Sequence, residues 1–245
     1  MSFDRFNRRK KAVLLRGDRS SKGNFDKRVI KLCEKVNSLG NYYTTSSCAG
    51  RVIVMKDEDK KGPNLFQFVS HDLIDVREFK KELDKILYPH PTRDFARGLI
   101  KNYSLPQNHS PTLITYNKHI TKSVNLVNSK SKFTTRGVSG VGLNCLNLKF
   151  KQEPCILHVV CRNLEDAFSI IDKAQRVGWK RSGIISKGKN DFIVELISTE
   201  KLEFPLTEKG KILVDDNFLK IILKKSNENL KKGWEKIKNL EKGIK

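Results

Sequence analysis

Several classes of protein are excluded by what this chain lacks. It has five cysteines in 245 residues, an odd number with no CxxC pair, which does not indicate a disulfide-stapled secreted domain. The longest apolar run, Cys155–Cys161, is interrupted by His158 and is far shorter than the roughly 20 residues that a membrane-spanning helix needs. No GxGxxG motif opens a predicted helix, and no GxxxxGK followed by Ser or Thr occurs, so a Rossmann nucleotide site and a P-loop are both unsupported. We expect a protein of a reducing compartment, with the cytoplasm as the default.

Acidic residues are also scarce relative to basic ones. The 49 Lys and Arg residues outnumber the 27 Asp and Glu residues, which gives a net charge of +22. Three segments supply most of this excess: residues 1–28 carry +7, residues 88–148 carry +7 and residues 224–245 carry +5. Such charge favours a polyanionic partner, and nucleic acid is the usual one because each Lys or Arg on a phosphate releases counterions. A lysine-rich surface that serves only solubility is the alternative.

One long segment, 88–145, differs in kind from the rest of the chain. It is rich in Ser, Thr, Asn, Gly and Pro, and no helical or alternating hydrophobic period persists through it. A structureless loop of this length is rare in compact domains, so the segment is predicted to be a disordered insertion. We expect residues 1–245 to form a single domain that this insertion interrupts.

Hydrophobic periodicity predicts helices and strands on both sides of this segment. Helices are expected after the cap Asp26 as far as Leu39, from Asp75 to Leu87, from Leu164 to Val177 and from Asp216 to Leu240. Strands are expected at 42–46, 52–55, 65–70, 146–150, 156–161, 184–186, 192–197 and 202–206, with 184–186 and 192–197 forming a hairpin. Strands and helices mix without strict alternation, so the predicted class is α+β, a compact mixed-sheet fold with flanking helices that is not Rossmann-type.

The segment Thr45–Arg51 (TSSCAGR) joins two predicted strands and is the first candidate site. Its small hydroxyl residues, its glycine and its arginine can present backbone N–H groups and a guanidinium to one anion, a phosphate or a carboxylate. An ordinary hairpin turn with a solvated arginine explains the same residues equally well. Cys48 could be a nucleophile, but no His or Asp lies at a telling spacing, and free cysteines usually serve packing. Ser182 and Gly183 similarly permit close approach of a ligand to the backbone, or form a plain turn.

The spacing Cys155-x2-His158-x2-Cys161 suggests a metal site, but strand geometry opposes it. On a strand the two cysteines share one face, while the histidine points to the other. A fourth ligand is not evident either. We therefore predict no zinc site here.

The same segment also offers groups for acid–base chemistry. Glu153, His158 and Arg162 place a carboxylate, an imidazole and a guanidinium within ten residues of one another. His71, at the end of a predicted strand, could approach from elsewhere in the sheet. Sequence alone does not distinguish such histidines from structural ones.

Read together, these segments resemble one protein family. In the order seen in the tRNA wybutosine-synthesising protein 3 family, the chain contains DRSxKGxxD (18–26), YTTSSCAGR (43–51), VSH (69–71), LKF (148–150), EPxILHVxCR (153–162), GWxxSGI (178–184) and PLxxKGK (205–211). The resemblance covers everything except the 88–145 region, which the family would pass over almost directly.

The resemblance implies an S-adenosylmethionine-dependent methyltransferase acting on tRNA, with a compact α+β fold distinct from the Rossmann-type methyltransferases. In that family the methyl group goes to N-4 of 7-(3-amino-3-carboxypropyl)-4-demethylwyosine, at position 37 of phenylalanine tRNA, during wybutosine biosynthesis. The basic segments suit the phosphates of an anticodon stem, and a base in the anticodon loop requires little opening of the duplex.

The chemistry of the side chains in these motifs leads to a hypothesis about the roles of individual residues. We expect cofactor binding by Ser46, Ser47, Cys48, Gly50, Arg51, Ser182 and Gly183, acceptance of the N-4 proton by His158 or Glu153 with His71 in reserve, and RNA contacts by Lys149, Arg162 and Lys22. Two other hypotheses compete. A tRNA-binding module without catalysis would not bind S-adenosylmethionine, and a Cys48-dependent hydrolase would lose its activity on thiol labelling.

Overall fold

The computed structural model describes residues 2–16, 26–58, 62, 64–87, 146–189 and 191–244. The chain outside residues 88–144 forms one compact unit. The predicted insertion at 88–145 lies outside the described residues, and so does the candidate Lys22. Within the described ranges, no helix is long and apolar enough to cross a membrane.

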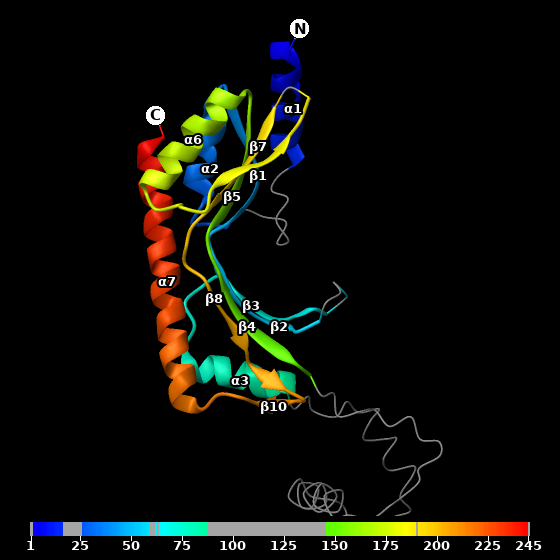
Figure 1. The fold of residues 1–245 in the computed structure, drawn as a ribbon, viewed down its shortest axis with the longest axis vertical. Coiled ribbons are helices and arrows are strands. Elements are labelled where there is room, and N and C mark those ends of the chain that lie inside the picture. The colour runs from blue at the N-terminus through cyan, green and yellow to red at the C-terminus, as the bar shows by residue number, and fades with distance from the viewer. Residues whose placement is uncertain are drawn as a thin grey trace, which may run out of the picture. The chain divides into compact units, whose positions relative to one another are not determined.

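Helices and strands alternate irregularly along the chain (Figure 1). The helices are α1 (Ser2–Arg16), α2 (Ile30–Ser38), α3 (Val76–Leu87), α6 (Leu164–Arg176) and α7 (Asp216–Gly243). The strands are β1 (Tyr42–Cys48), β2 (Arg51–Lys56), β3 (Phe66–Ser70), β4 (Leu148–Glu153), β5 (Ile156–Cys161), β6 (Gly183–Lys187), β7 (Phe192–Ile197), β8 (Leu202–Pro205), β9 (Thr207–Glu208) and β10 (Lys211–Ile212). The α+β class predicted from the sequence is confirmed.

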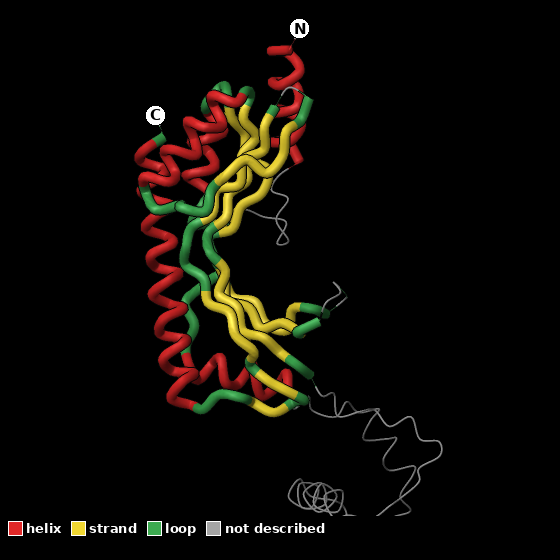
Figure 2. The backbone as a smooth tube through the Cα atoms, viewed as in Figure 1, coloured by secondary structure: helices red, strands yellow, loops and turns green. Residues whose placement is uncertain are grey.

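The strands form two four-stranded sheets and a short ribbon of β9 and β10. The first sheet has the order β1-β5-β7-β6, and the second has the order β3-β2-β4-β8. Every pair among the described strands is antiparallel, so the arrangement is not Rossmann-type. Figure 2 shows both sheets ranged along α7. Strand β8 lies at a sheet edge, the position that the sequence predicts because Pro205 has no N–H to donate.

The chain passes from one sheet to the other three times, at residues 49–50, 154–155 and 198–201, which we name the crossover layer. Hydrogen bonds join the three passages: Cys155 Sγ donates to Ala49 O at 3.2 Å, and Ser198 N donates to Cys155 O at 3.1 Å. Gly50 makes the first passage with a φ of 90°, and a Cβ there would lie 3.2 Å from Glu153 O. Because β1 and β2 lie in different sheets, the hairpin interpretation of this segment is wrong.

Each sheet packs one face on its own hydrophobic core, and α7 contributes to both cores. Leu219, Leu223 and Leu230 lie in the core of the second sheet, whereas Ile237 and Leu240 lie in the core of the first. All five are almost fully buried, and burial of each such side chain stabilises the fold by about 1.5–3 kcal/mol. The two sheets are thus held to one continuous helix.

Local capping signals set the start of one helix and not of another. The Asn163 side chain accepts a hydrogen bond from Asp166 N at 2.8 Å and caps α6, as predicted. The helix that was predicted to follow Asp26 is α2, and it begins at Ile30, four residues after this expected cap. Asp26 instead accepts from Arg28 N at 3.2 Å within a preceding turn. The other oxygen of its carboxylate is therefore available to His71, which follows β3.

Candidate functional site

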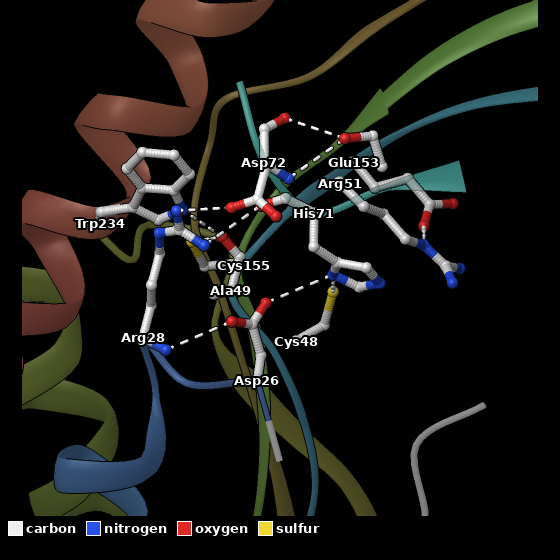
Figure 3. Close-up of polar contacts among 11 residues, drawn as sticks. Asp26, Arg28, Cys48, Ala49, Arg51, His71, Asp72, Glu153, Cys155 and Trp234 are labelled. Atoms are coloured by element: carbon white, nitrogen blue, oxygen red, sulfur yellow. Dashed lines mark hydrogen bonds and ion pairs between the residues drawn. The ribbon is translucent and has the colours of Figure 1, made fainter. Parts of the chain in front are cut away.

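Three residues from separate parts of the sequence meet beside the crossover layer and form what we name the His71 cluster (Figure 3). His71 follows β3, Cys48 ends β1, and Asp26 precedes α2. His71 Nδ1 lies 3.3 Å from Asp26 Oδ2 and 3.9 Å from Cys48 Sγ. Asp26 is almost entirely buried, and its Oδ2 has no other hydrogen-bond partner within the described part of the chain.

The His71 cluster carries a positive charge on its imidazole near neutral pH. The hydrogen bond with Asp26, reinforced by Cys48, raises the pKa of His71 to about 9 despite partial burial. Burial on its own would raise the pKa of Asp26, but hydrogen bonds from His71 and the Arg28 N–H hold it below its usual value. The cluster is thus an ion pair whose imidazolium can bind an anion.

The turn that carries Asp26 is held in place by α7. The Arg28 guanidinium stacks over the Trp234 ring, 3.9 Å from its centroid, and also contacts Asp72 Oδ1 at 2.7 Å. Trp234 Nε1 in turn donates to Ala49 O, in the crossover layer, at 3.1 Å. Figure 3 shows this stack to the left of the His71 cluster. One tryptophan therefore orients both the Asp26 turn and the end of β1.

A second cationic group lies at the start of β2. Arg51 faces Glu153 across the β2–β4 ladder, and its Nε donates to Glu153 Oε2 at 2.7 Å. The Arg51 side chain is 18% exposed, so it is not the solvated arginine of a plain turn. Its guanidinium also lies over the Phe66 ring, 5.3 Å from the centroid. Glu153 is engaged by this cation and is more distantly approached by Lys151.

A third set of polar side chains lies side by side on three strands of the first sheet, on the face opposite its core. Ser46 Oγ lies 2.6 Å from His158 Nδ1, and His158 Nε2 lies 2.8 Å from Glu195 Oε1. These three residues are register neighbours on β1, β5 and β7, and Gly183 on β6 is the next in the row. We name the three polar residues Ser46, His158 and Glu195 the His158 row.

The structure brings only some of the sequence-predicted site residues together. Five of them lie at or beside the crossover layer, namely Cys48, Gly50, Arg51, Glu153 and His71. Ser46 lies two residues before Cys48 on β1. Ser47 points to the opposite face of β1 and is buried.

Other predicted residues lie apart from the crossover layer. Arg162 donates to Gly40 O at 2.7 Å and to Asn7 Oδ1 at 3.1 Å, near α1. Lys149 contacts Asp57 Oδ1 at 2.8 Å on β4 of the second sheet.

Ser182 has a structural use for its hydroxyl. It donates to Trp179 O at 2.7 Å and accepts from Ile197 N at 3.2 Å, which fastens the turn before β6 onto β7. The adjacent Gly183 has open space where a Cβ would stand. Of this predicted pair, Gly183 is the residue whose small size leaves room beside the His158 row.

The trio Cys155, His158 and Cys161 does not share a face, as strand parity predicts. Both cysteines are buried in the core of the first sheet, whereas His158 lies on the other side of β5. Burial raises the pKa of Cys161 to about 12, so its thiol stays protonated. Within the described ranges, no group of three or more His, Cys, Asp or Glu side chains could hold a metal ion.

Two residues of these groups, Asp26 and Glu195, were not predicted as site residues from the sequence. Asp26 was explained by helix capping, although it also ends the DRSxKGxxD motif. Glu195 is a lone charged residue within the apolar strand FIVELI, which is the signal that could have drawn attention to it. Neither partner, His71 or His158, is near these residues in the sequence.

Comparison with known proteins shows the family to which this chain belongs. The family model described as "Methyltransferase TYW3" matches residues 8–245. A tRNA(Phe) 7-((3-amino-3-carboxypropyl)-4-demethylwyosine(37)-N(4))-methyltransferase of Thermococcus sibiricus is 30% identical, covering 96% of this chain and 92% of the relative. A tRNA wybutosine-synthesizing protein 3 homolog of Danio rerio is 28% identical, covering 97% of this chain and 73% of the relative.

A solved structure is similar to this chain in fold as well. A protein of Pyrococcus horikoshii superposes with a TM-score of 0.64 at 26% identity, covering 98% of this chain and 94% of that one. Each of these matches extends over nearly the whole length of this chain, so they are not limited to one motif. The resemblance deduced from the sequence motifs is confirmed, and the chain belongs to the methyltransferase TYW3 family.

Proposed function

We propose that this chain transfers a methyl group from S-adenosylmethionine to N-4 of 7-(3-amino-3-carboxypropyl)-4-demethylwyosine at position 37 of phenylalanine tRNA. The observation that supports it best is the convergence at the crossover layer of three family motifs, which end in Asp26, Arg51 and His71. Relatives that match this chain over nearly its full length carry that activity in their names. Because the substrate is tRNA, we propose the cytoplasm as the compartment.

The residues beside the crossover layer fit the methionine end of S-adenosylmethionine, which carries an ammonium and a carboxylate. The buried Asp26 carboxylate offers an oxygen, Oδ2, without a second hydrogen-bond partner among the described residues, and this oxygen suits the ammonium. The cationic His71 and the Arg51 guanidinium suit the carboxylate. When bound, the cofactor supplies an electrophilic methyl group on a sulfonium sulfur.

We assign different roles to the two histidines. His71 is already protonated near neutral pH, so it serves as an anion-binding group rather than as a proton acceptor. The Glu153 carboxylate is already engaged by the Arg51 guanidinium, so we assign it to holding Arg51 in place. His158 remains as the acceptor of the N-4 proton, a role that contributes about 10²–10⁴-fold in general base catalysis.

RNA binding is assigned to basic side chains around these groups. Arg162 and the α1 residues Arg5, Arg8 and Lys11 lie at the outer end of the first sheet, and Lys149 lies on the second. Phosphate contacts of this kind set affinity, whereas specificity comes from an unstacked base of the anticodon loop. We add Lys22 to this set from its place in the DRSxKGxxD motif.

The geometry of the His71 cluster speaks against a cysteine hydrolase. In a nucleophilic relay, the nucleophile and the orienting carboxylate contact opposite nitrogens of the imidazole. Here Cys48 Sγ and Asp26 Oδ2 both approach Nδ1 of His71. We therefore expect Cys48→Ser to retain methyl transfer, and loss of turnover in a folded, cofactor-binding variant would refute the non-covalent scheme.

The direct test is mass spectrometry of nucleosides from phenylalanine tRNA that carries the 4-demethyl precursor. The pure protein is incubated with this tRNA in the presence and absence of S-adenosylmethionine. A cofactor-dependent gain of one methyl group at the position-37 nucleoside supports the proposal. Calorimetric binding of S-adenosylmethionine and of tRNA provides the second readout, since a tRNA-binding module without catalysis binds the RNA alone.

A further inference from the structure

We propose that Ser46, His158 and Glu195 form a proton relay, in which Ser46 meets the substrate N–H and Glu195 is a positioning residue that orients His158. This inference rests on the proposed function and adds a path for the proton to it. It also moves Ser46 from cofactor binding to proton transfer. Glu195 lies outside all of the motifs that carry the family resemblance.

Strand register places the three residues side by side. Ser46 pairs with His158 across β1 and β5 after an irregularity at Thr45, and His158 pairs with Glu195 across β5 and β7. The contacts measure 2.6 Å from Ser46 Oγ to His158 Nδ1 and 2.8 Å from His158 Nε2 to Glu195 Oε1. His158 uses both ring nitrogens, one toward a hydroxyl and one toward a carboxylate.

These contacts select one tautomer of the neutral imidazole. A carboxylate only accepts hydrogen bonds, so Glu195 requires the proton of His158 to be on Nε2. Nδ1 is then unprotonated and accepts the hydroxyl proton of Ser46. The Ser46 oxygen is left with lone pairs that can accept a proton from outside the row.

The His158 row is open where a substrate would approach. The side chains of His158 and Glu195 are 28% and 29% exposed, and Gly183 leaves the space beyond Glu195 unfilled. One row further along the same face, Tyr43, Val160 and Ile193 are apolar, and Phe6 of α1 packs against them. The polar row is thus the part of this face next to the portion that α1 covers.

The position of the row along β1 connects it to the His71 cluster. Cys48 lies two residues from Ser46 on the same face of β1, a separation of about 7 Å along a strand, and contacts His71. A reactant held by the His71 cluster therefore has its reacting end within reach of Ser46. The relay and the anion-binding group are two ends of one site.

The N-4 lone pair forms the bond to the transferred methyl carbon, and the electron pair of the breaking carbon–sulfur bond stays on sulfur. The N-4 proton passes to Ser46 Oγ while the Ser46 hydroxyl proton passes to His158 Nδ1. The resulting imidazolium is stabilised by the ionised Glu195 on Nε2, and solvent later takes the proton.

Three variants and one control test this relay on the full chain. Glu195→Ala removes the carboxylate, Ser46→Ala removes the hydroxyl, and His158→Gln removes the acceptor. The control, Glu165→Ala, removes an exposed carboxylate on α6, on the far side of the first sheet. Methylation of the precursor tRNA gives kcat and KM, and ¹⁵N NMR of the His158 ring reports its tautomer without any substrate.

The proposal expects kcat to fall about 10²-fold in Ser46→Ala and His158→Gln and at least about 10-fold in Glu195→Ala, with KM within about threefold of wild type. It also expects an Nε2–H tautomer in wild type and in Glu165→Ala, and a mixture with Nδ1–H in Glu195→Ala. Wild-type kcat in Glu195→Ala or Ser46→Ala overturns the relay, as does an Nδ1–H tautomer in the wild type. If the wild type transfers no methyl group, the proposed function fails instead, while the tautomer measurement still stands by itself.

Discussion

The ion pair between His71 and Asp26 makes stability depend on pH in a defined direction. The folded-state pKa of about 9 lies above the value of about 6.5 expected for an unfolded histidine. The pair therefore contributes fully below pH 6.5, where both states are protonated, and its contribution is lost as the pH rises through 9. A difference of about 2.5 pH units corresponds to about 3 kcal/mol. The His71 side chain is only 18% exposed, so solvent screens this energy little.

The perturbation that isolates this energy is His71→Gln, measured against wild type by urea unfolding from pH 5.5 to pH 9.5. Fluorescence of the two tryptophans, Trp179 and Trp234, follows the transition because both pack in the cores. The wild type should exceed the variant by about 3 kcal/mol at the acid end and by less than about 0.5 kcal/mol at the alkaline end.

The control for this measurement is the same substitution in an Asp26→Asn background, where the difference should be small and nearly independent of pH. A gap between wild type and His71→Gln that stays constant from pH 5.5 to 9.5 would refute the assignment of a cationic His71. Such a result would also remove the anion-binding role that this charge supports.

Three further predictions concern the residues around the crossover layer. Gly50→Ala should destabilise the fold by about 2 kcal/mol, because φ is 90° and the new Cβ meets its neighbours at 3.2 Å; an unchanged urea midpoint contradicts this. Trp234→Phe should cost about 1–2 kcal/mol, since it removes the hydrogen bond to Ala49 O and weakens the stack with Arg28; calorimetric melting measures the loss, and a wild-type Tm argues against this bracing role. Arg51→Lys should keep the fold and weaken S-adenosylmethionine about 10-fold in calorimetric titrations, because lysine lacks the planar fork of donors; an unaltered Kd places the cofactor elsewhere.

Sequence patterns predicted the elements better than their partners. The hairpin of β6 and β7 and the cap of α6 were predicted because turn and capping chemistry act over a few residues. The separation of β1 and β2 into different sheets was not predicted, since the intervening residues look like a local turn. It results from pairing with β5 and β4, about 100 residues further along, which no local pattern reveals.

In the candidate site, too, residues were noticed in the sequence without their partners. Arg51 and Glu153 were each noticed as charged residues, but only the β2–β4 register makes them partners. Asp26 had a sufficient local explanation as a cap, so its role beside His71 required the fold. His158 was correctly placed on the face of β5 opposite both cysteines, because strand parity needs no tertiary information.

The way the two sheets are built has a consequence for how the chain assembles. Strands β1 and β2 come from the first part of the chain, and their ladders to β5 and β4 come from the part after residue 145. Helix α2 likewise packs against α7. Neither part can satisfy its backbone or cover its apolar face alone, so separate polypeptides ending at 87 and beginning at 146 should each be unfolded. Mixed together, they should fold in a single bimolecular event, and methyl transfer would then appear with second-order kinetics.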